Sequence, residues 1–254
     1  MKVVILAGGY GTRISEETIN KPKPLVEIGT KPIIWHIMKF YSYYGFNEFI
    51  ICTGYKGYCF NEYFENYFSH NSDVTYNIYD NTRIIHNSIL ENWKVTLVQT
   101  GLDTMTGGRL LRIRDYIKDD IFMLTYGDGL ININLNLLLK SHKAAGKIAT
   151  ITAVSPPARF GALNIKENTV INFKEKPTGF ESLINGGYFV FHKNIFSYLK
   201  DDETILERSP LEEIASIGEL NAFIHEGFWQ PMDTLRDKNY LEESWIKDPQ
   251  WKIW

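Results

Sequence analysis

Short apolar runs typical of buried strands alternate with helical segments through the first half of this 254-residue chain. Residues 2–6 are β-branched and apolar, and residues 49–52 and 121–125 repeat the pattern. Between the first two runs, apolar residues from Pro32 onward recur at helical spacing up to a stop at Gly45. Strands that alternate with helices pair in parallel, because each crossover needs a helix. The pattern predicts an α/β, Rossmann-like fold whose mostly parallel central sheet carries helices on both faces.

The remaining elements follow from the same two periodicities. We expect strands at 74–79, 95–99, 149–154 and 220–224, and helices at 58–68, 108–117, 135–145, 211–217 and 235–245. Residues 80–94 are polar and mixed, which indicates a protruding hairpin or loop. After residue 154 strands dominate, at 162–165, 170–173 and 188–191, so we expect a small, partly antiparallel added section.

Composition excludes several classes of protein. The net charge is −3 and no dense basic run exists, so nucleic-acid binding is not expected. No run approaches the roughly 18 apolar residues of a membrane span. The two cysteines, Cys52 and Cys59, form no framework of disulfides, which fits a reducing, cytoplasmic setting.

Because the net charge is negative, no overall positive field attracts anionic ligands. Any phosphate site must be built locally, from backbone N–H groups and a few basic side chains.

The loop LAGGYGTR follows the first predicted strand directly. Gly8, Gly9 and Gly11 let backbone N–H groups approach a ligand without a Cβ in the way, as suits oxygen-rich anions. Thr12 adds a hydroxyl and Arg13 a charged fork that fits phosphate. By itself the cluster is equally compatible with a plain strand-to-turn connection that binds nothing.

Two familiar phosphate motifs are excluded, and a basic turn follows the loop. The pattern G-x-x-x-x-G-K-[ST] is absent, and Ile14 occupies the third glycine position of the dinucleotide fingerprint. Downstream, prolines hold Lys21 and Lys23 in an extended backbone. Alone this would be a solvated basic turn, but beside the glycine loop it indicates that Lys23 neutralises phosphate.

Two aspartates are candidate metal ligands. Asp128 lies between Gly127 and Gly129 at the end of a predicted buried strand, where open α/β sheets bind their ligands. Mg²⁺ takes few protein carboxylates and completes its shell with phosphate oxygens and water. The alternative for Asp128 is an ordinary tight turn. Asp233 is the second candidate, although from sequence alone it is better explained as the N-cap of the helix near Leu235.

Two further motifs lie in the strand-rich section. Glu175-Lys176-Pro177 follows a predicted strand, and Asn185-Gly186-Gly187 precedes one. A lysine for a phosphate and an asparagine with glycine clearance for hydroxyls would complete an acceptor site. Taken singly, a charged turn and a β-turn explain them better.

In order, the motifs GG-x-GTR, PKP, GDG, EKP and NGG resemble the signature of the sugar-phosphate nucleotidyltransferases, and the match covers nearly the whole chain. Longer stretches such as TMTGGRL, INGGYFV and FWQPMDTLRDK resemble the cytidylyltransferases of that family. The resemblance implies Mg²⁺-assisted transfer of a cytidylyl group from CTP to α-D-glucose 1-phosphate, giving CDP-glucose and pyrophosphate. A related transferase with another nucleoside triphosphate or another sugar phosphate is the alternative.

The resemblance also implies roles for particular residues. Arg13, Lys23 and Asp128 would be catalytic, and Asp128 and Asp233 would bind Mg²⁺. The nucleotide would contact Leu6, Ala7, Gly8, Gly9, Tyr10, Gly11, Thr12, Arg13, Lys23, Thr104, Gly108, Arg109 and Gly127. The sugar phosphate would contact Gly161, Glu175, Lys176, Asn185 and Gly186.

Because the chain contains no internal repeat, low-complexity tract or flexible linker, we expect a single domain over residues 1–254, with a nucleotide half over about 1–130 and a sugar-phosphate half over about 131–254. The resemblance further implies a cytoplasmic homo-oligomer that serves lipopolysaccharide O-antigen biosynthesis. Tyr10, where a smaller residue is usual, and residues 80–91 depart from the family pattern. Tryptophans crowd the C-terminal end, which indicates either a buried tail or a subunit interface.

Overall fold

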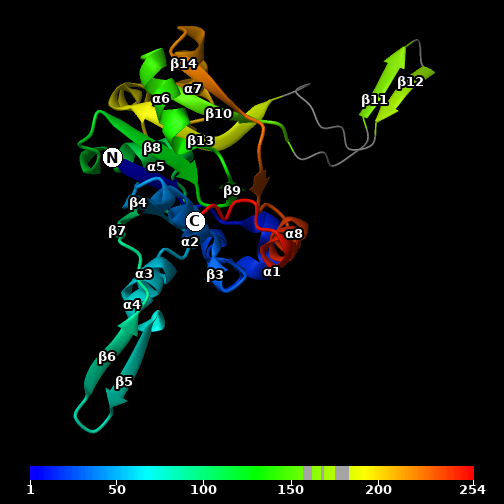
Figure 1. The fold of residues 1–254 in the computed structure, drawn as a ribbon. Coiled ribbons are helices and arrows are strands. Elements are labelled where there is room, and N and C mark those ends of the chain that lie inside the picture. The colour runs from blue at the N-terminus through cyan, green and yellow to red at the C-terminus, as the bar shows by residue number, and fades with distance from the viewer. Residues whose placement is uncertain (157–161, 167–168, 175–182) are drawn as a thin grey trace.

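A seven-stranded sheet forms the centre of the molecule, in the order β14-β10-β13-β8-β1-β4-β7 (Figure 1). The computed structural model describes residues 1–156, 162–166, 169–174 and 183–254. Strands from both halves of the chain join this one sheet: β1 (Lys2–Leu6), β4 (Glu48–Thr53), β7 (Lys94–Gln99), β8 (Ile121–Tyr126), β10 (Ala149–Val154), β13 (Ile184–His192) and β14 (Leu220–His225).

Most strand pairs of the sheet are parallel. Strand β1 pairs in parallel with both β4 and β8, β4 with β7, and β10 with β14, whereas β13 runs antiparallel to β8 and β10. The predicted α/β fold with a mostly parallel sheet is therefore confirmed. The antiparallel insertion of β13 between β8 and β10 brings the Asn185 motif to the end of β8.

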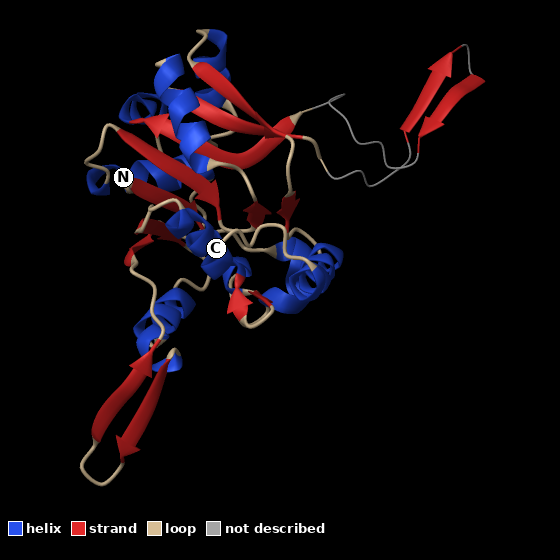
Figure 2. Ribbon diagram, in the orientation of Figure 1, coloured by secondary structure: helices blue, strands red, loops and turns tan. Residues whose placement is uncertain are grey.

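Helices cover both faces of the sheet, as Figure 2 shows. Alternate residues of β1 enter two separate cores, with Val3 and Ile5 in one and Val4 and Leu6 in the other. The first core is covered by α2 (Ile33–Tyr43), α6 (Leu135–Ala145) and α8 (Leu235–Lys247), and the second by α5 (Thr106–Arg112) and α7 (Ser209–Ser216).

Two predicted helices differ from those observed. The helix expected over 58–68 is divided at Asn66 into α3 (Tyr58–Glu65) and α4 (Tyr67–His70). The helix expected from residue 108 begins earlier, at Thr106, and ends at Arg112, followed by a 3₁₀ turn over Arg114–Tyr116. Gly107 and Gly108 weaken a helical pattern, but α5 needs them because their backbones pack against Thr204 and Asp202.

Small antiparallel pairs and short helical turns complete the fold. A protruding hairpin is present, but it is formed by β5 and β6 over residues 72–88 and so includes the strand expected at 74–79; it extends away from the sheet (Figure 1). The pairs are β2 (Glu27–Ile28) with β3 (Lys31–Pro32), β5 (Ser72–Asn77) with β6 (Thr82–Ser88), β9 (Gly129–Ile131) with β15 (Trp229–Pro231), and β11 (Ala162–Lys166) with β12 (Thr169–Lys174). The short helices are α1 (Ser15–Thr18) and the 3₁₀ turns Thr12–Ile14, Lys23–Leu25 and Lys193–Tyr198.

The C-terminal tryptophans pack around His36 of α2. Trp251 is fully buried, and its Nε1 donates to His36 Nδ1 at 3.3 Å. His36 Nε2 lies 2.9 Å from the carbonyl oxygen of Ile28, and the Trp245 ring meets the imidazole edge-on at 4.9 Å. This burial supports the buried-tail interpretation for Trp251. No helix in the described part of the chain is long and apolar enough to cross a membrane.

Neutral His36 should contribute to stability, because its burial lowers its pKa to about 4. The unfolded chain takes up this proton below about pH 6.5, whereas the folded chain does so only near pH 4. The contribution of His36 to the free energy of unfolding should therefore fall by about 3 kcal/mol between these pH values.

Urea denaturation of the wild type and of His36→Gln across this pH range measures that contribution. The gap between the two unfolding free energies should narrow as the pH falls. His70→Gln, at an exposed histidine, is the control for the loss of one imidazole. Parallel wild-type and His36→Gln curves would contradict the assignment.

Candidate active site

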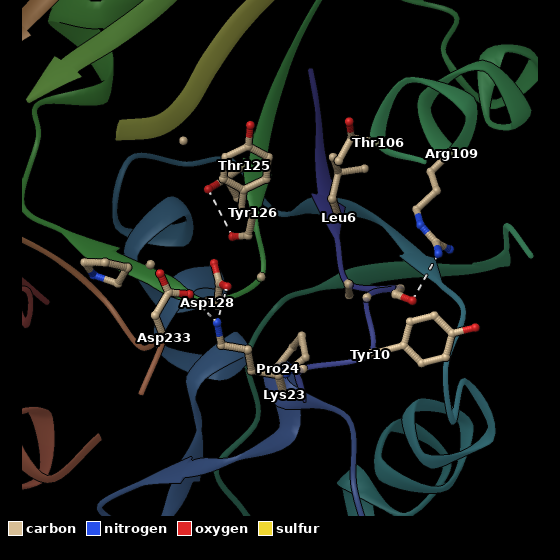
Figure 3. Close-up of a pocket in the computed structure, with 18 of the residues that line it drawn as sticks. Leu6, Tyr10, Lys23, Pro24, Thr106, Arg109, Thr125, Tyr126, Asp128 and Asp233 are labelled. Atoms are coloured by element: carbon tan, nitrogen blue, oxygen red, sulfur yellow. Dashed lines mark hydrogen bonds and ion pairs between the residues drawn. The ribbon is translucent and has the colours of Figure 1, made fainter. Parts of the chain in front are cut away.

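A pocket of about 780 Å³ opens beyond the carboxyl ends of β1 and β8. Open α/β sheets bind ligands at this edge because helix N-termini and loops converge there. The pocket is lined by residues 6–14, Lys23, Pro24, Leu102, Asp103, Thr104, Met105, Thr106, Arg109, residues 125–129, residues 185–188, Glu207, Trp229, Pro231 and Asp233. Figure 3 shows the side chains that approach one another across it.

The glycine-rich loop is fixed at both of its ends. Gly11 adopts a left-handed conformation with φ of 67°, which glycine supports without a steric penalty. The Thr18 hydroxyl donates to the carbonyl oxygens of Gly11 at 3.2 Å and of Ile14 at 3.1 Å. Near the start of the loop, the N–H of Tyr55 donates to the carbonyl oxygen of Gly8 at 3.2 Å. The loop is therefore a preformed wall of the pocket.

Arg109 of α5 links the glycine-rich loop to the segment that follows β7. Its guanidinium donates to the carbonyl oxygen of Gly8 at 3.1 Å (dashed in Figure 3) and to those of Gly101 and Leu102 at 2.7 and 3.1 Å. It also donates to the Thr100 hydroxyl at 2.8 Å. Burial lowers the pKa of Arg109, but the ring of oxygen acceptors compensates for much of the lost hydration.

Lys23 lies between two carboxylates that come from distant parts of the chain. Its Nζ is 2.6 Å from Asp128 Oδ2 and 2.8 Å from Asp233 Oδ1 (Figure 3). Arg13 Nη1 lies 3.1 Å from Asp233 Oδ2. Burial alone would lower the pKa of Lys23, but the two carboxylates outweigh it and raise that pKa. Lys23 therefore stays charged inside the pocket.

The backbone holds the two aspartates together. Asp128 follows β8, and its carbonyl oxygen accepts the N–H of Met232 at 2.8 Å, one residue before Asp233. The N-cap of α8 is Thr234, whose side chain and that of Asp237 form a capping box. The N-cap role considered for Asp233 is therefore wrong, and the Asp233 carboxylate instead faces Lys23.

The two carboxylates fit a divalent cation such as Mg²⁺. They already share one cation, the Lys23 ammonium, and both line the pocket. No group of three or more metal-binding side chains occurs among the described residues. Mg²⁺ suits such a sparse site because phosphate oxygens and water supply its other ligands.

The loop residues 6–13, Lys23, Thr104, Arg109, Gly127, Asp128, Asn185, Gly186 and Asp233 all line this one pocket, as the sequence predicts for a shared site. Gly108 does not, because it packs against the backbone of Asp202. Gly161, Glu175 and Lys176 lie outside the described residues.

Several lining residues carry no motif that would have revealed them. Asp103 accepts a hydrogen bond from the Tyr10 hydroxyl at 2.6 Å, which explains how the unusual Tyr10 is held. Trp229, by contrast, lies in the FWQPMDTLRDK stretch, and it donates from Nε1 to the carbonyl oxygen of Gly186 at 2.8 Å. Tyr126 directly precedes the Gly127 turn, so its position could have been inferred, whereas Glu207 lies in a stretch without a signature.

Sequence comparisons show which known proteins the chain resembles. A family model described as "Nucleotidyl transferase" matches residues 2–230. The chain is 56% identical to glucose-1-phosphate cytidylyltransferase of Salmonella typhimurium and 46% identical to the probable enzyme of that name in Bacillus subtilis, in each case over 100% of both chains. It is 28% identical to the mannose-1-phosphate guanylyltransferase catalytic subunit beta of Dictyostelium discoideum, over 98% of this chain and 67% of that one.

Solved structures share the fold at low sequence identity. HddC from Yersinia pseudotuberculosis superposes with a TM-score of 0.70 at 23% identity, covering 96% of this chain and 99% of that one. A UDP-glucose pyrophosphorylase complexed with UDP-glucose gives a TM-score of 0.69 at 18% identity, covering 97% and 98%.

Gly8 and Gly9 offer a matched test of the loop. A Cβ on Gly8 would lie 2.1 Å from Arg109 Nη1, whereas a Cβ on Gly9 would meet nothing within 4 Å. Gly8→Ala should therefore displace Arg109 and lower the free energy of unfolding by about 1–3 kcal/mol. Gly9→Ala should leave it nearly unchanged. Denaturant unfolding of both variants decides, and equal losses would contradict the role given to Arg109.

Proposed function

Because the chain belongs to the nucleotidyl transferase family, we propose that it transfers a cytidylyl group from CTP to α-D-glucose 1-phosphate, giving CDP-glucose and pyrophosphate. Full-length identity of 56% to a glucose-1-phosphate cytidylyltransferase supports both substrates. The observation that carries the proposal is the convergence of Arg13, Lys23, Asp128 and Asp233 beside the glycine loop in one pocket.

The glycine loop and its neighbours would bind the nucleotide. Backbone N–H groups of residues 6–13 can approach phosphate oxygens, and Arg13 and Lys23 supply positive charge. Thr104, Arg109 and Gly127 also line the pocket and would contact the base and ribose. Since Arg109 is held by the carbonyl oxygens of Gly8 and Gly101, it would also keep the loop in a binding conformation before the nucleotide arrives.

Asp128 and Asp233 would hold Mg²⁺. When bound, the ion would supply charge neutralisation and Lewis-acid polarisation at the phosphates. The existing contact of both carboxylates with the Lys23 ammonium supports this assignment, since it places two oxygens where one cation can satisfy both.

The chemical step needs positioning more than proton transfer. An ionised phosphate oxygen of the acceptor attacks the α-phosphorus of CTP in line, and pyrophosphate leaves, so no strong general base is required. Bringing two unit negative charges to 4 Å costs about 4 kcal/mol at an effective dielectric near 20. Arg13 and Lys23 offset this repulsion and fix the approach of the two phosphates. Asn185 and Gly186 would orient the acceptor at the other side of the pocket.

We further propose that the protein works as a homo-oligomer in the cytoplasm and supplies an activated sugar for lipopolysaccharide O-antigen biosynthesis. Exposed apolar side chains at the turn of the β5–β6 hairpin support association, because Ile78 is 86% and Tyr79 97% exposed.

Pyrophosphate release tests the reaction and the role of Asp128 together. The wild type should release pyrophosphate only when CTP, glucose 1-phosphate and Mg²⁺ are all present. Asp128→Ala should reduce turnover by at least about 100-fold, because the phosphates lose an electrostatic partner. Asp119→Ala, at an exposed aspartate outside the pocket, is the control.

A panel of nucleoside triphosphates and sugar 1-phosphates decides the alternative substrates. Faster turnover with another pair would replace CTP and glucose 1-phosphate with that pair. Absence of release with every pair would overturn the proposal.

Lys23 and the metal ion should compete for the same carboxylates. Lys23→Gln removes the ammonium that Asp128 and Asp233 share, while Arg13 still pairs with Asp233, so Mn²⁺ should bind the nucleotide-free variant at least about tenfold more tightly than the wild type. Turnover of the same variant should fall. Titration of free Mn²⁺ by electron paramagnetic resonance measures the affinity, with Lys21→Gln as the control because Lys21 pairs with Glu27 instead. Weaker Mn²⁺ binding by Lys23→Gln would refute the shared site.

A further inference from the structure

Glu207 lines the active-site pocket although it belongs to no recognisable motif. It follows the buried Leu206 in the segment that leads from the 3₁₀ turn Lys193–Tyr198 to α7. One carboxylate oxygen, Oε2, accepts a hydrogen bond from the Thr106 hydroxyl at 2.6 Å. The other, Oε1, accepts a short hydrogen bond from the Tyr126 hydroxyl. The carboxylate is therefore held from both sides at the pocket wall.

The donors around Glu207 all have fixed directions. The Thr106 oxygen accepts the N–H of Leu206 at 2.9 Å, so its hydrogen is directed to Glu207. Burial and the neighbouring Glu207 carboxylate raise the pKa of Tyr126 strongly, so its hydroxyl remains a donor. Asn185 donates from Nδ2 to the Tyr126 oxygen at 3.3 Å. A run of hydrogen bonds from Asn185 thus ends on the carboxylate.

Glu207 keeps acceptor capacity for a ligand. A carboxylate has about four lone-pair sites, and the contacts with Thr106 and Tyr126 use one on each oxygen. Asp128 and Asp233 face the Lys23 ammonium, whereas in the described part of the chain the hydrogen-bond partners of Glu207 are neutral hydroxyls. Such a group attracts hydroxyl donors and repels phosphate.

The position of Glu207 in the pocket determines which hydroxyl groups of a ligand it can contact. Figure 3 places its partners Thr106 and Tyr126 on one side of the pocket and Lys23 with the two aspartates on another. The acceptor phosphate must lie near the cationic side, so its sugar ring extends from there toward the carboxylate. Asn185, which would contact the acceptor, belongs to the same hydrogen-bonded run.

We propose that Glu207 determines acceptor specificity by accepting hydrogen bonds from hydroxyl groups of the sugar ring, with Thr106 and Tyr126 holding its carboxylate in place. This inference rests on the proposed transferase function. It assigns to Glu207 the orientation of the acceptor, with phosphate toward Lys23 and hydroxyls toward the carboxylate, and no part in the chemistry at phosphorus.

Steady-state kinetics of Glu207→Gln in the full chain tests the assignment. The amide cannot accept from both hydroxyls and a ligand as the carboxylate does, so KM for glucose 1-phosphate should rise at least about tenfold. KM for CTP should change less than about twofold, because the proposal gives Glu207 a contact with the sugar hydroxyls of the acceptor and none with the nucleotide. Glu203→Gln, at an exposed residue of the same segment outside the pocket, should leave both values unchanged. A general structural defect would raise both KM values together.

Monodeoxy analogues of glucose 1-phosphate supply the second readout. The wild type should lose at least about tenfold in kcat/KM on the analogue that lacks the contacted hydroxyl, whereas Glu207→Gln should barely distinguish that analogue from glucose 1-phosphate. If Glu207→Gln does not fold, Glu207→Asp, which withdraws the carboxylate by one methylene, should show the same KM split.

Failure of this inference is separable from failure of the proposed function. Wild-type turnover with unchanged KM for glucose 1-phosphate in Glu207→Gln would overturn only the role of Glu207. A rise confined to KM for CTP would indicate that the Glu207 carboxylate contacts the ribose of the nucleotide, and this result would also overturn the role of Glu207 in acceptor binding. No turnover by the wild type with any sugar phosphate would overturn the transferase itself.

Discussion

The ion pairs of Lys23 with Asp128 and Asp233 join three segments that are far apart in the sequence. They connect the basic turn after the glycine loop, the end of β8 and the end of β15. A backbone hydrogen bond from the N–H of Met232 to the carbonyl oxygen of Asp128 also joins the end of β8 to the end of β15. A partly buried ammonium is tolerable only because carboxylates neutralise it, and the carboxylates in turn need a cation. The pocket is thus arranged around a cation position before any ligand binds.

Much of the fold could be predicted because its elements follow simple periodicities. The alternation of strands and helices was sufficient for the parallel part of the sheet, since crossovers leave few alternatives. The antiparallel placement of β13 between β8 and β10 could not be derived that way, because register and neighbour depend on packing. The sequence predicts a helix from Gly108, whereas α5 begins at Thr106 and includes Gly107 and Gly108, whose backbones pack closely on Thr204 and Asp202.

From local pattern alone, the candidate site was predictable where residues lie beside glycines or prolines, whereas Thr104 became a candidate only through the family resemblance. Lys23 and Asp128 stand in such turns, and the structure brings them together. The sequence alone favours Asp233 as the N-cap of α8, because the residue that caps the helix, Thr234, is only one position away. Glu207 reaches the pocket only through the packing of its segment against Thr106 and Tyr126, so no local pattern indicates it. Its distinct chemistry gives the pocket a hydroxyl-accepting side opposite the phosphate-binding one.

In the proposed reaction a divalent ion would take the place now held by the Lys23 ammonium, and Lys23 would move to the triphosphate. Anomalous diffraction from crystals of the protein grown with Mn²⁺ and CTP measures this directly. We expect a manganese ion bound by both Asp128 and Asp233, with Lys23 Nζ in contact with a phosphate oxygen of CTP. A manganese ion bound elsewhere, or Lys23 still bridging the two carboxylates beside bound CTP, would contradict this proposal.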